Sequence, residues 1–262
     1  MVNNIYPTVK SQPLGFIVYE GPSIIDGSPI VVIVNKIFSA SANAKTGDIV
    51  QSFIIRSDIN PLEALSTGDD VGVCGNCEHR PALVNAGNGK APCYVNVGQS
   101  VASIYKAYKR GRYVKASASF VAQFLKGKTL RLGTYGDPAA APVAMWHDLA
   151  KGADRRVGYS HQWESLGFDV NAWSSLVMAS ADTPEQRLLA NVKGMRTFRV
   201  SQPGTIPAKG EISCPASAEA GRKTTCSDCK LCGGTSIKAK DIVIQDHARG
   251  FNARRVISIA TA

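Results

Sequence analysis

Four cysteines in the last quarter of the sequence have the spacing of a metal site. Cys226, Cys229 and Cys232 follow one another at two-residue intervals, and Cys214 stands twelve residues before the first of them. Such intervals turn the sulfurs toward the inside of one tight turn, as a tetrahedral thiolate site or an iron–sulfur cluster requires. Cys214 and His247 each follow a predicted strand, so either can complete the set. We expect a zinc ion here, with an iron–sulfur cluster as the alternative.

Three further cysteines form a second group earlier in the chain. Cys74 and Cys77 make a Cys-x2-Cys knuckle, and Cys93 returns after fifteen residues. His79 is close enough in sequence to serve as a fourth ligand. We predict that this group also binds zinc or a cluster; thiols that only pack together are the alternative. The two groups could also converge on one site.

Polar side chains follow the predicted strands in the second half of the chain. Because the carboxyl ends of parallel strands meet at one edge of a sheet, these side chains are expected to lie together. A carboxylate there can act as nucleophile or general base, a second as the acid, and Gln162 can read the edge of a base. Helix capping by the aspartates is the structural alternative. The candidate catalytic residues are Asp137, Asp182 and His161, and the candidate substrate-binding residues beside them are Tyr135, Gln162 and Ser180.

The motifs of several common enzyme classes are missing from the sequence. It has no Gly-x4-Gly-Lys-Ser/Thr phosphate loop and no Gly-x-Gly-x2-Gly motif, so nucleoside triphosphate hydrolysis and dinucleotide redox chemistry have no support. It also lacks His-x-Glu followed by Pro-Cys-x2-Cys, so the zinc deaminase mechanism is not indicated.

Positive charge is concentrated in one predicted helix at residues 99–112. Over the whole chain Lys and Arg total 30 against 20 Asp and Glu, a formal net charge of +10. Such a surplus favours a polyanionic partner. Lys109, Arg110 and Arg112 are predicted to contact phosphates, next to tyrosines that could stack on bases. We therefore expect a nucleic acid partner, DNA in the first place; an ordinary solvated helix face is the alternative.

The elements that position these residues predict an α/β protein. Runs rich in Val, Ile and Phe between residues 14 and 56, separated by turn signals, predict antiparallel strands. From Thr129 onward short strands alternate with helices, which predicts six parallel strands and a full or partial (βα) barrel. We divide the chain into an N-terminal β region at 1–70 and a barrel-like domain at 71–262, with metal-binding segments at 74–93 and 214–247.

Cysteine usage and hydropathy predict the compartment. No run of eighteen apolar residues exists, and the first residues lack the basic-then-apolar pattern of a signal peptide. All seven cysteines fall into the two groups, which in a reducing compartment indicates metal binding and not a disulfide framework. We therefore expect a cytoplasmic protein without a membrane partner.

Two resemblances extend these predictions. The cysteine pattern, together with Gly136-Asp137 and the Cys93-Tyr94 dipeptide, resembles a phage-encoded family of small cysteine-rich proteins known as "gene product 88"-like, over roughly residues 70 to 250. This resemblance implies work in the cytoplasm of a host cell. A βα barrel that ends in a cysteine-rich metal site with a late histidine is also similar to the guanine transglycosylase superfamily, including the branch that inserts 7-deazaguanine bases into phage DNA. In that superfamily one aspartate is the covalent nucleophile and another the general acid/base, which implies these roles for Asp137 and Asp182.

The order of parts is also similar to that of radical S-adenosylmethionine enzymes. A cysteine group precedes the βα series, Gly136-Asp137-Pro138 ends one strand, and Ala179-Ser180-Ala181-Asp182 ends a later one. This resemblance implies an iron–sulfur cluster at the three-cysteine group. We favour base exchange on DNA guanine, with a modified base as the small-molecule substrate. The radical enzyme is the alternative, and a non-enzymatic DNA-binding or replication protein with structural metal knuckles is the third hypothesis.

Overall fold

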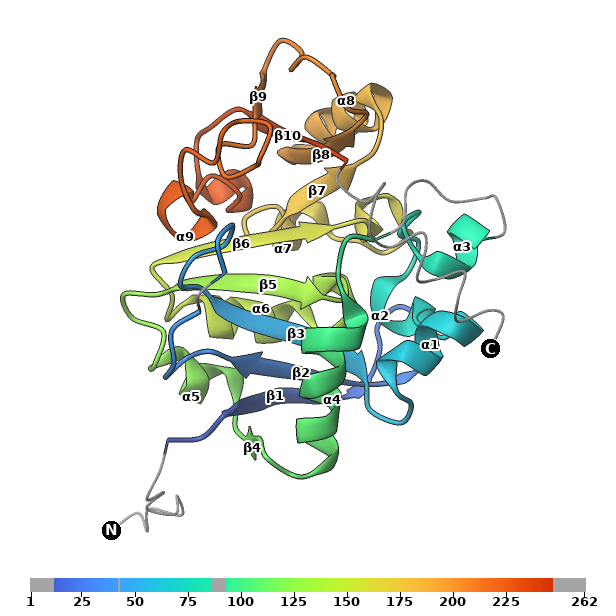
Figure 1. Cartoon of the computed structure of the whole chain (residues 1–262), viewed down its shortest axis with the longest axis vertical. Coiled ribbons are helices and arrows are strands. Elements are labelled where there is room, and N and C mark those ends of the chain that lie inside the picture. The colour runs from blue at the N-terminus through green and yellow to red at the C-terminus, as the bar shows by residue number, and fades with distance from the viewer. Residues whose placement is uncertain (1–11, 42, 86–92, 247–262) are drawn as a thin grey trace.

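One open sheet runs through the part of the chain that the computed structural model describes, residues 12–41, 43–85 and 93–246 (Figure 1). Its strands are β1 (Gly15–Pro22), β2 (Pro29–Asn35), β3 (Val50–Arg56), β4 (Val114–Lys115), β5 (Thr129–Tyr135), β6 (Arg155–Ser160), β7 (Met178–Ala181), β8 (Thr197–Ser201), β9 (Glu211–Ser213) and β10 (Asp241–Gln245). The helices are α1 (Pro61–Thr67), α2 (Val71–Cys74), α3 (Pro81–Asn85), the π-helix η1 (Val97–Val101), α4 (Ala102–Lys109), α5 (Ala118–Ala122), α6 (Val143–Ala150), α7 (Val170–Trp173), α8 (Pro184–Val192) and α9 (Cys226–Cys229). Three short 3-10 helices are η2 (Pro138–Ala140), η3 (Gln162–Glu164) and η4 (Gly234–Ser236).

The strand order confirms the α/β prediction. The order is β4-β1-β2-β3-β5-β6-β7-β8-β10-β9. The pairs β1–β2 and β2–β3 are antiparallel, whereas β3 pairs in parallel with β5 and the following strands continue parallel to β9. The two regions predicted at 1–70 and 71–262 therefore share one sheet.

The prediction of a full barrel is wrong. A barrel would need β3 to pair with the last parallel strands, but the free side of β3 is occupied along its length by β2. β2 in turn pairs with β1, so the hairpin extends the sheet and carries its edge away from β9. Burial explains why the hairpin remains there: six of the seven residues of β2 are buried, as expected for a strand inside a sheet.

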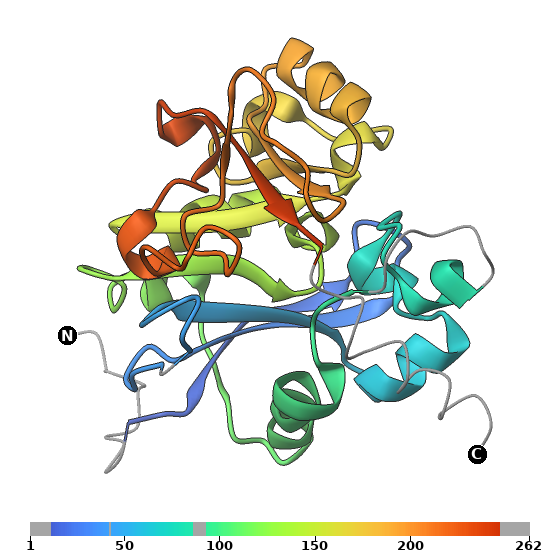
Figure 2. The same ribbon diagram turned by 45° about the horizontal axis from the view of Figure 1, so that its top comes forward.

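Helices and loops cover both faces of this sheet. In Figure 1, α6 and α7 lie behind the strands, whereas α4 and the segment around α9 lie in front of them. Figure 2 shows the same arrangement from a second angle, with α4 and the α9 segment on different parts of the molecule. The main core joins strands β1, β2, β3 and β5, and Ala179 of β7, to the helices, and a smaller apolar cluster at the C-terminal end contains Met178, Ile242 and Cys214. No helix of the described residues is long and apolar enough to cross a membrane.

Candidate functional site

The carboxyl ends of three neighbouring parallel strands carry polar residues to one edge of the sheet. Asp137 follows β5, His161 follows β6, and Asp182 follows β7. In open α/β sheets, ligands bind outside this edge. The α1–α2 segment after β3 arrives at the same place, because the Asp137 backbone N–H donates to the carbonyl of Val73 at 2.6 Å.

Asp182 holds two histidines together at this edge. One carboxylate oxygen lies 3.0 Å from His79 Nε2, and the other lies 3.4 Å from His161 Nε2. The Asp182 side chain is only 3% exposed. Capping, the alternative for this residue, does not apply, because Thr183 accepts the Gln186 N–H at the start of α8.

These contacts shift the pKa values of Asp182 and His161. Burial acts to raise the pKa of Asp182, but hydrogen bonds from His161 and His79 outweigh it, and the pKa falls far below its usual range. Burial likewise acts to lower the pKa of His161, but the charges of Cys77 and Asp182 raise it well above its usual value. The Cys77 sulfur lies 4.0 Å from His161 Nε2. The edge therefore holds a buried network that can store and pass a proton at His161 Nε2.

The three-cysteine group (Cys74, Cys77 and Cys93) lies against this network. Cys74 ends α2, the Cys77 N–H bonds to the Cys74 carbonyl, and the Cys93 N–H bonds to the His79 carbonyl. The pKa of Cys74 is raised well above its usual value, first by burial and then by negative charge at neighbours that include Cys77 and Cys93. The three thiols therefore converge, and no disulfide joins any of the seven cysteines.

A buried ion pair fixes the loop that carries these thiols. The Arg80 guanidinium donates to both oxygens of Asp70, at 3.0 and 2.8 Å, and also to the carbonyls of Gly68 and Gly75. Asp70 is 1% exposed and Arg80 8%. Paired guanidinium–carboxylate bonds of this kind hold geometry well, so Arg80 is a positioning residue that the sequence reasoning missed. The sequence feature that could have indicated this role is the pair of opposite charges, Asp70 and Arg80, on either side of the Cys-x2-Cys knuckle.

Asp137 is an anchor in this structure. Its carboxylate accepts the Ala139 N–H at 3.0 Å, the Ser160 hydroxyl at 2.7 Å and the His161 N–H at 2.7 Å. The residue is 7% exposed, and burial raises its pKa. The capping alternative therefore holds for this aspartate, which also fixes the turn that presents His161. Its catalytic role stays a prediction.

Gln162 contacts the knuckle and does not face open space. Its side-chain amide donates to the Cys74 carbonyl at 3.3 Å and its carbonyl accepts the Ser165 hydroxyl at 3.2 Å. A Cβ added at Gly75 would lie 2.4 Å from this side chain, and Gly75 has a positive φ of 55°. Position 75 therefore favours glycine for two reasons, the close contact with Gln162 and the positive φ. The predicted reading of a base edge would need Gln162 to leave this contact.

The other two candidate residues at this edge, Tyr135 and Ser180, are buried. The Tyr135 hydroxyl is buried and has no hydrogen-bond partner among the described residues. Its pKa is raised well above the usual value, first by burial and then by negative charge at Cys74, Asp70 and Cys93. Ser180 is 6% exposed within β7, and its carbonyl accepts the Trp163 indole N–H at 2.7 Å.

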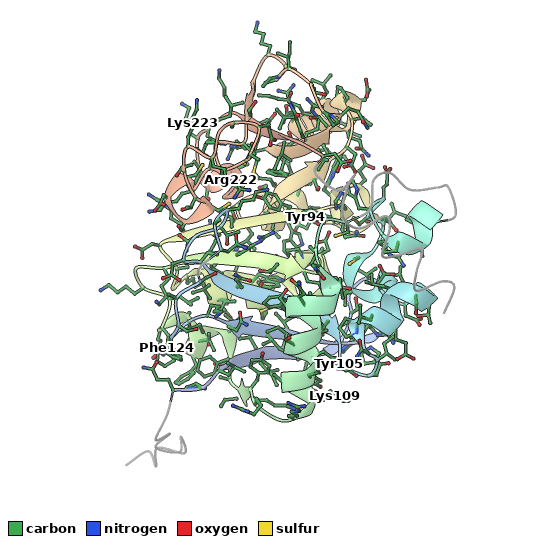
Figure 3. All side chains as sticks on the ribbon, viewed as in Figure 1. Tyr94, Tyr105, Lys109, Phe124, Arg222 and Lys223 are labelled. Carbon is green, nitrogen blue, oxygen red and sulfur yellow. The ribbon has the colours of Figure 1, made fainter. Side chains whose placement is uncertain are left out.

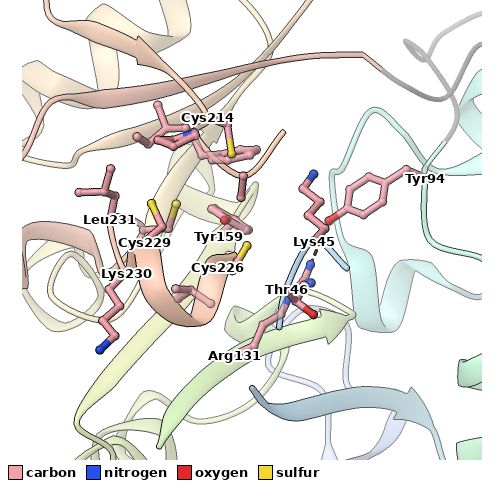
Figure 4. Close-up of a pocket in the computed structure, with 16 residues that line it drawn as sticks. Lys45, Thr46, Tyr94, Arg131, Tyr159, Cys214, Cys226, Cys229, Lys230 and Leu231 are labelled. Atoms are coloured by element: carbon pink, nitrogen blue, oxygen red, sulfur yellow. Dashed lines mark hydrogen bonds between the residues drawn. The ribbon is translucent and has the colours of Figure 1, made fainter. Parts of the chain in front are cut away.

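The four-cysteine group (Cys214, Cys226, Cys229 and Cys232) lines one pocket on the front of the sheet (Figure 4). The pocket has a volume of about 50 Å³, against roughly 10–15 Å³ for one water. Its other walls include Tyr94, Arg131 and Tyr159, with Lys45 at one side. Burial, with charge at the other three thiols, raises the pKa of Cys232 to about 12. The predicted fourth ligand His247 lies outside the described residues.

One set of side chains among the described residues already has its ligand atoms close enough to hold a metal ion. In the described part of the chain, the only three or more His, Cys, Asp or Glu ligand atoms within 4.8 Å of one another belong to His79, His161 and Asp182. A tetrahedral zinc ion with bonds of about 2.3 Å holds its sulfurs about 3.8 Å apart. No three sulfurs of either cysteine group lie within 4.8 Å of one another among the described residues, so a zinc ion there would require the thiols to move closer together. A cluster attaches its thiolates to different irons and spaces them more widely.

The basic surface lies at the C-terminal end of α4 and in the residues that follow it. Lys109, Arg110 and Arg112 are all exposed, and the Lys109 ammonium lies 5.8 Å from the Tyr105 ring (Figure 3). Tyr105 and Tyr113 are buried in the core, so neither can stack on a base. The three cations remain available to phosphates and lie apart from the catalytic candidates.

Comparison of the chain with protein-family models, with curated proteins and with solved structures found no match. The arguments that follow therefore depend on the geometry of the two cysteine groups and their neighbours.

Proposed function

We propose that the protein is an iron–sulfur enzyme of the radical S-adenosylmethionine type, with its reaction at the carboxyl edge of β5, β6 and β7. One observation carries the proposal: Cys74, Cys77 and Cys93 lie near one another at this edge, and the Cys77 sulfur is 4.0 Å from His161 Nε2 of the Asp182 network. A cluster bound by these three cysteines would have one iron without a protein ligand, and it would supply one-electron reduction of a small co-substrate.

The chain's own residues supply the rest of the site. Arg80 and Gln162 hold the cysteine loop, and Asp137 fixes the backbone of His161. The Asp182 carboxylate holds His79 and His161 at positions where either imidazole can give or take a proton beside the thiols. We propose nucleic acid as the substrate class, because the exposed cations at the C-terminal end of α4 can contact phosphates and the net charge is +10.

The test is anaerobic reconstitution with iron and sulfide, followed by incubation with S-adenosylmethionine and dithionite as the one-electron donor. We expect a brown protein that consumes S-adenosylmethionine and releases methionine. Cys74→Ser with Cys77→Ser should abolish this release, whereas Lys109→Ala with Arg110→Ala should retain it and weaken DNA binding for all sequences alike. A reconstituted protein that contains iron but leaves S-adenosylmethionine intact would reject the radical reaction.

Base exchange on DNA guanine is a second candidate, favoured by the contacts of both aspartates with His161. Asp137 accepts the His161 N–H and Asp182 contacts its ring. Asp182 is the better placed acid/base, since Asp137 would have to give up three hydrogen bonds to act as nucleophile. A colourless zinc protein that exchanges labelled guanine in DNA, and loses this activity in Asp182→Asn, would support this candidate.

A further inference from the structure

Four thiols from separate segments meet in the pocket on the front of the sheet. Cys214 follows β9, Cys226 and Cys229 lie on α9, and Cys232 follows that helix. Two backbone bonds hold α9 in place, from Cys226 N–H to the Lys45 carbonyl and from Ser227 N–H to the Thr46 carbonyl, both at 3.0 Å. The ligand set is therefore closed by the loop between β2 and β3.

The surroundings of the pocket suit a negatively charged group larger than one ion. Lys45 and Arg131 supply cations that act on Cys226, while Tyr159, Phe198 and Leu231 supply apolar walls. Four thiolates around an iron–sulfur core carry net negative charge, which nearby cations stabilise in a site of low dielectric. No three of the four sulfurs lie within the 4.8 Å that holds for the histidine–aspartate set of the described residues.

We propose that Cys214, Cys226, Cys229 and Cys232 bind a second, redox-active iron–sulfur cluster that exchanges electrons with the cluster at Cys74, Cys77 and Cys93. The second site stands on its own geometry, and only the exchange rests on the function proposed for the first. Exchange makes and breaks no bond: one electron moves between the clusters, and an external one-electron donor replaces it.

One dipeptide joins the two centres. Cys93 belongs to the three-cysteine group, and the next residue, Tyr94, lines the four-cysteine pocket. The Tyr94 hydroxyl accepts a hydrogen bond from the Arg131 guanidinium at 3.0 Å. Arg131 and Cys226 both line the pocket, so covalent and hydrogen-bonded contacts run from Cys93 to its wall.

The strands place the centres at a short separation. Arg131 lines the four-cysteine pocket, and Tyr135 lies near Cys74 and Cys93. Both residues are on β5, and because β5 bulges between them, their partners on β3, Gln51 and Phe53, are only two positions apart, which corresponds to about 7 Å along an extended strand. Electrons tunnel readily between redox centres over such a distance inside one protein.

Metal content of group-specific variants tests the second site. After anaerobic reconstitution, Cys226→Ser with Cys229→Ser should lose about half of the wild-type iron and sulfide, as [4Fe–4S] clusters at both groups require. Cys74→Ser with Cys77→Ser should lose the other half, and the fourfold variant nearly all. Unchanged iron in the first double variant, or zinc lost from it in place of iron, overturns the second cluster. If only the three-cysteine group proves empty, the second cluster stands and the proposed function fails.

A variant that keeps all seven cysteines tests the second site even if the cysteine variants fail to fold. Arg131→Gln removes a cation from the pocket wall, so the iron content should stay at the wild-type level while one of two reduction steps moves to lower potential. Gln can still donate a hydrogen bond toward Tyr94. If neither step moves, the cluster is not beside Arg131 and its placement in this pocket is overturned.

Electron paramagnetic resonance of the dithionite-reduced protein tests the exchange. Two clusters joined by this short stretch of β5 should couple magnetically, so the wild-type spectrum should differ from the sum of the spectra of the two double variants. A wild-type spectrum equal to that sum would overturn the exchange, while the iron counts would still report on the second site.

Discussion

The two cysteine groups are held in contrasting ways. The three-cysteine group at the edge is surrounded by ionisable side chains, with the Arg80–Asp70 pair below it and Asp182, His79 and His161 beside it. The four-cysteine group lies among apolar and aromatic side chains, with Lys45 and Arg131 as its neighbouring cations, and is closed by backbone bonds from α9. Proton transfer needs groups of the first kind, whereas electron storage needs only a shielded site. From this contrast we infer that the substrate reacts at the edge and that the four-cysteine pocket stores electrons.

The largest expected effect is at the edge, from Arg80→Leu. Removing the guanidinium leaves Asp70 buried without its cation, which should lower the free energy of unfolding by about 3–5 kcal/mol. The measurement is urea denaturation of the metal-free protein. The exposed Arg110→Leu serves as control and should change stability by less than about 0.5 kcal/mol. Equal losses in both variants would mean that the edge does not depend on its buried ion pair.

Asp137→Asn should have the next largest effect. The new amide can keep its oxygen toward the Ala139 N–H and the Ser160 hydroxyl, but its NH2 group then faces the His161 N–H, which also donates, so we expect a loss of about 2–3 kcal/mol. The cluster of the three-cysteine group should also be lost sooner on chelation, while the four-cysteine cluster keeps its rate. Denaturation and timed iron release by a chelator measure the two effects. If both clusters are lost at the same accelerated rate, Asp137 supports the whole sheet and not the edge alone.

A pair of glycine variants separates close contact from backbone strain. Gly75→Ala brings a methyl group against Gln162, whereas Gly127→Ala, also at positive φ, meets nothing within 4 Å. Gly75→Ala should therefore lose about 1–2 kcal/mol more than Gly127→Ala. Thermal unfolding of the two variants measures the difference. Equal losses would show that Gln162 moves aside without cost, which would free it for a substrate.

The smallest effect is a pH dependence in the C-terminal half. Burial acts to raise the pKa of Glu211, but hydrogen bonds from Arg199 and the Ala208 N–H outweigh it and leave the pKa lowered. A lowered carboxyl pKa contributes stability above the unfolded value of about 4.3, and this contribution is lost as pH falls through the folded value. Below about pH 4, the free energy of unfolding should fall more steeply in the wild type than in Glu211→Gln. Parallel curves would remove Glu211 from the acid response.

The strands and their direction were open to prediction from the sequence because their signals are local. Runs such as Pro29–Asn35 and Thr129–Tyr135 show their apolar pattern within a few residues. Failure to close into a barrel was not visible, because it depends on β2 occupying the free side of β3. Strands of similar composition do not indicate which of them will pair with β3.

In the candidate site too, the residues could be predicted from local signals, whereas their contacts could not. Residue type and strand-end position were sufficient to select Asp182 and His161, and the knuckle drew attention to His79. The contact between Asp182 and His79 spans 103 residues, and the contact between Gln162 and Cys74 spans 88. Such pairings depend on how strands are ordered, so sequence reasoning assigned Gln162 to a substrate when it contacts the cysteine loop.

The bonds between α9 and the β2–β3 loop also constrain synthesis of the chain. Lys45 and Thr46 leave the ribosome early, whereas Cys226 and Ser227 follow about 180 residues later, and their backbones must meet before the pocket exists. The edge is complete once Asp182 has emerged. A chain still under translation can thus assemble the edge first, and the four-cysteine pocket is finished last.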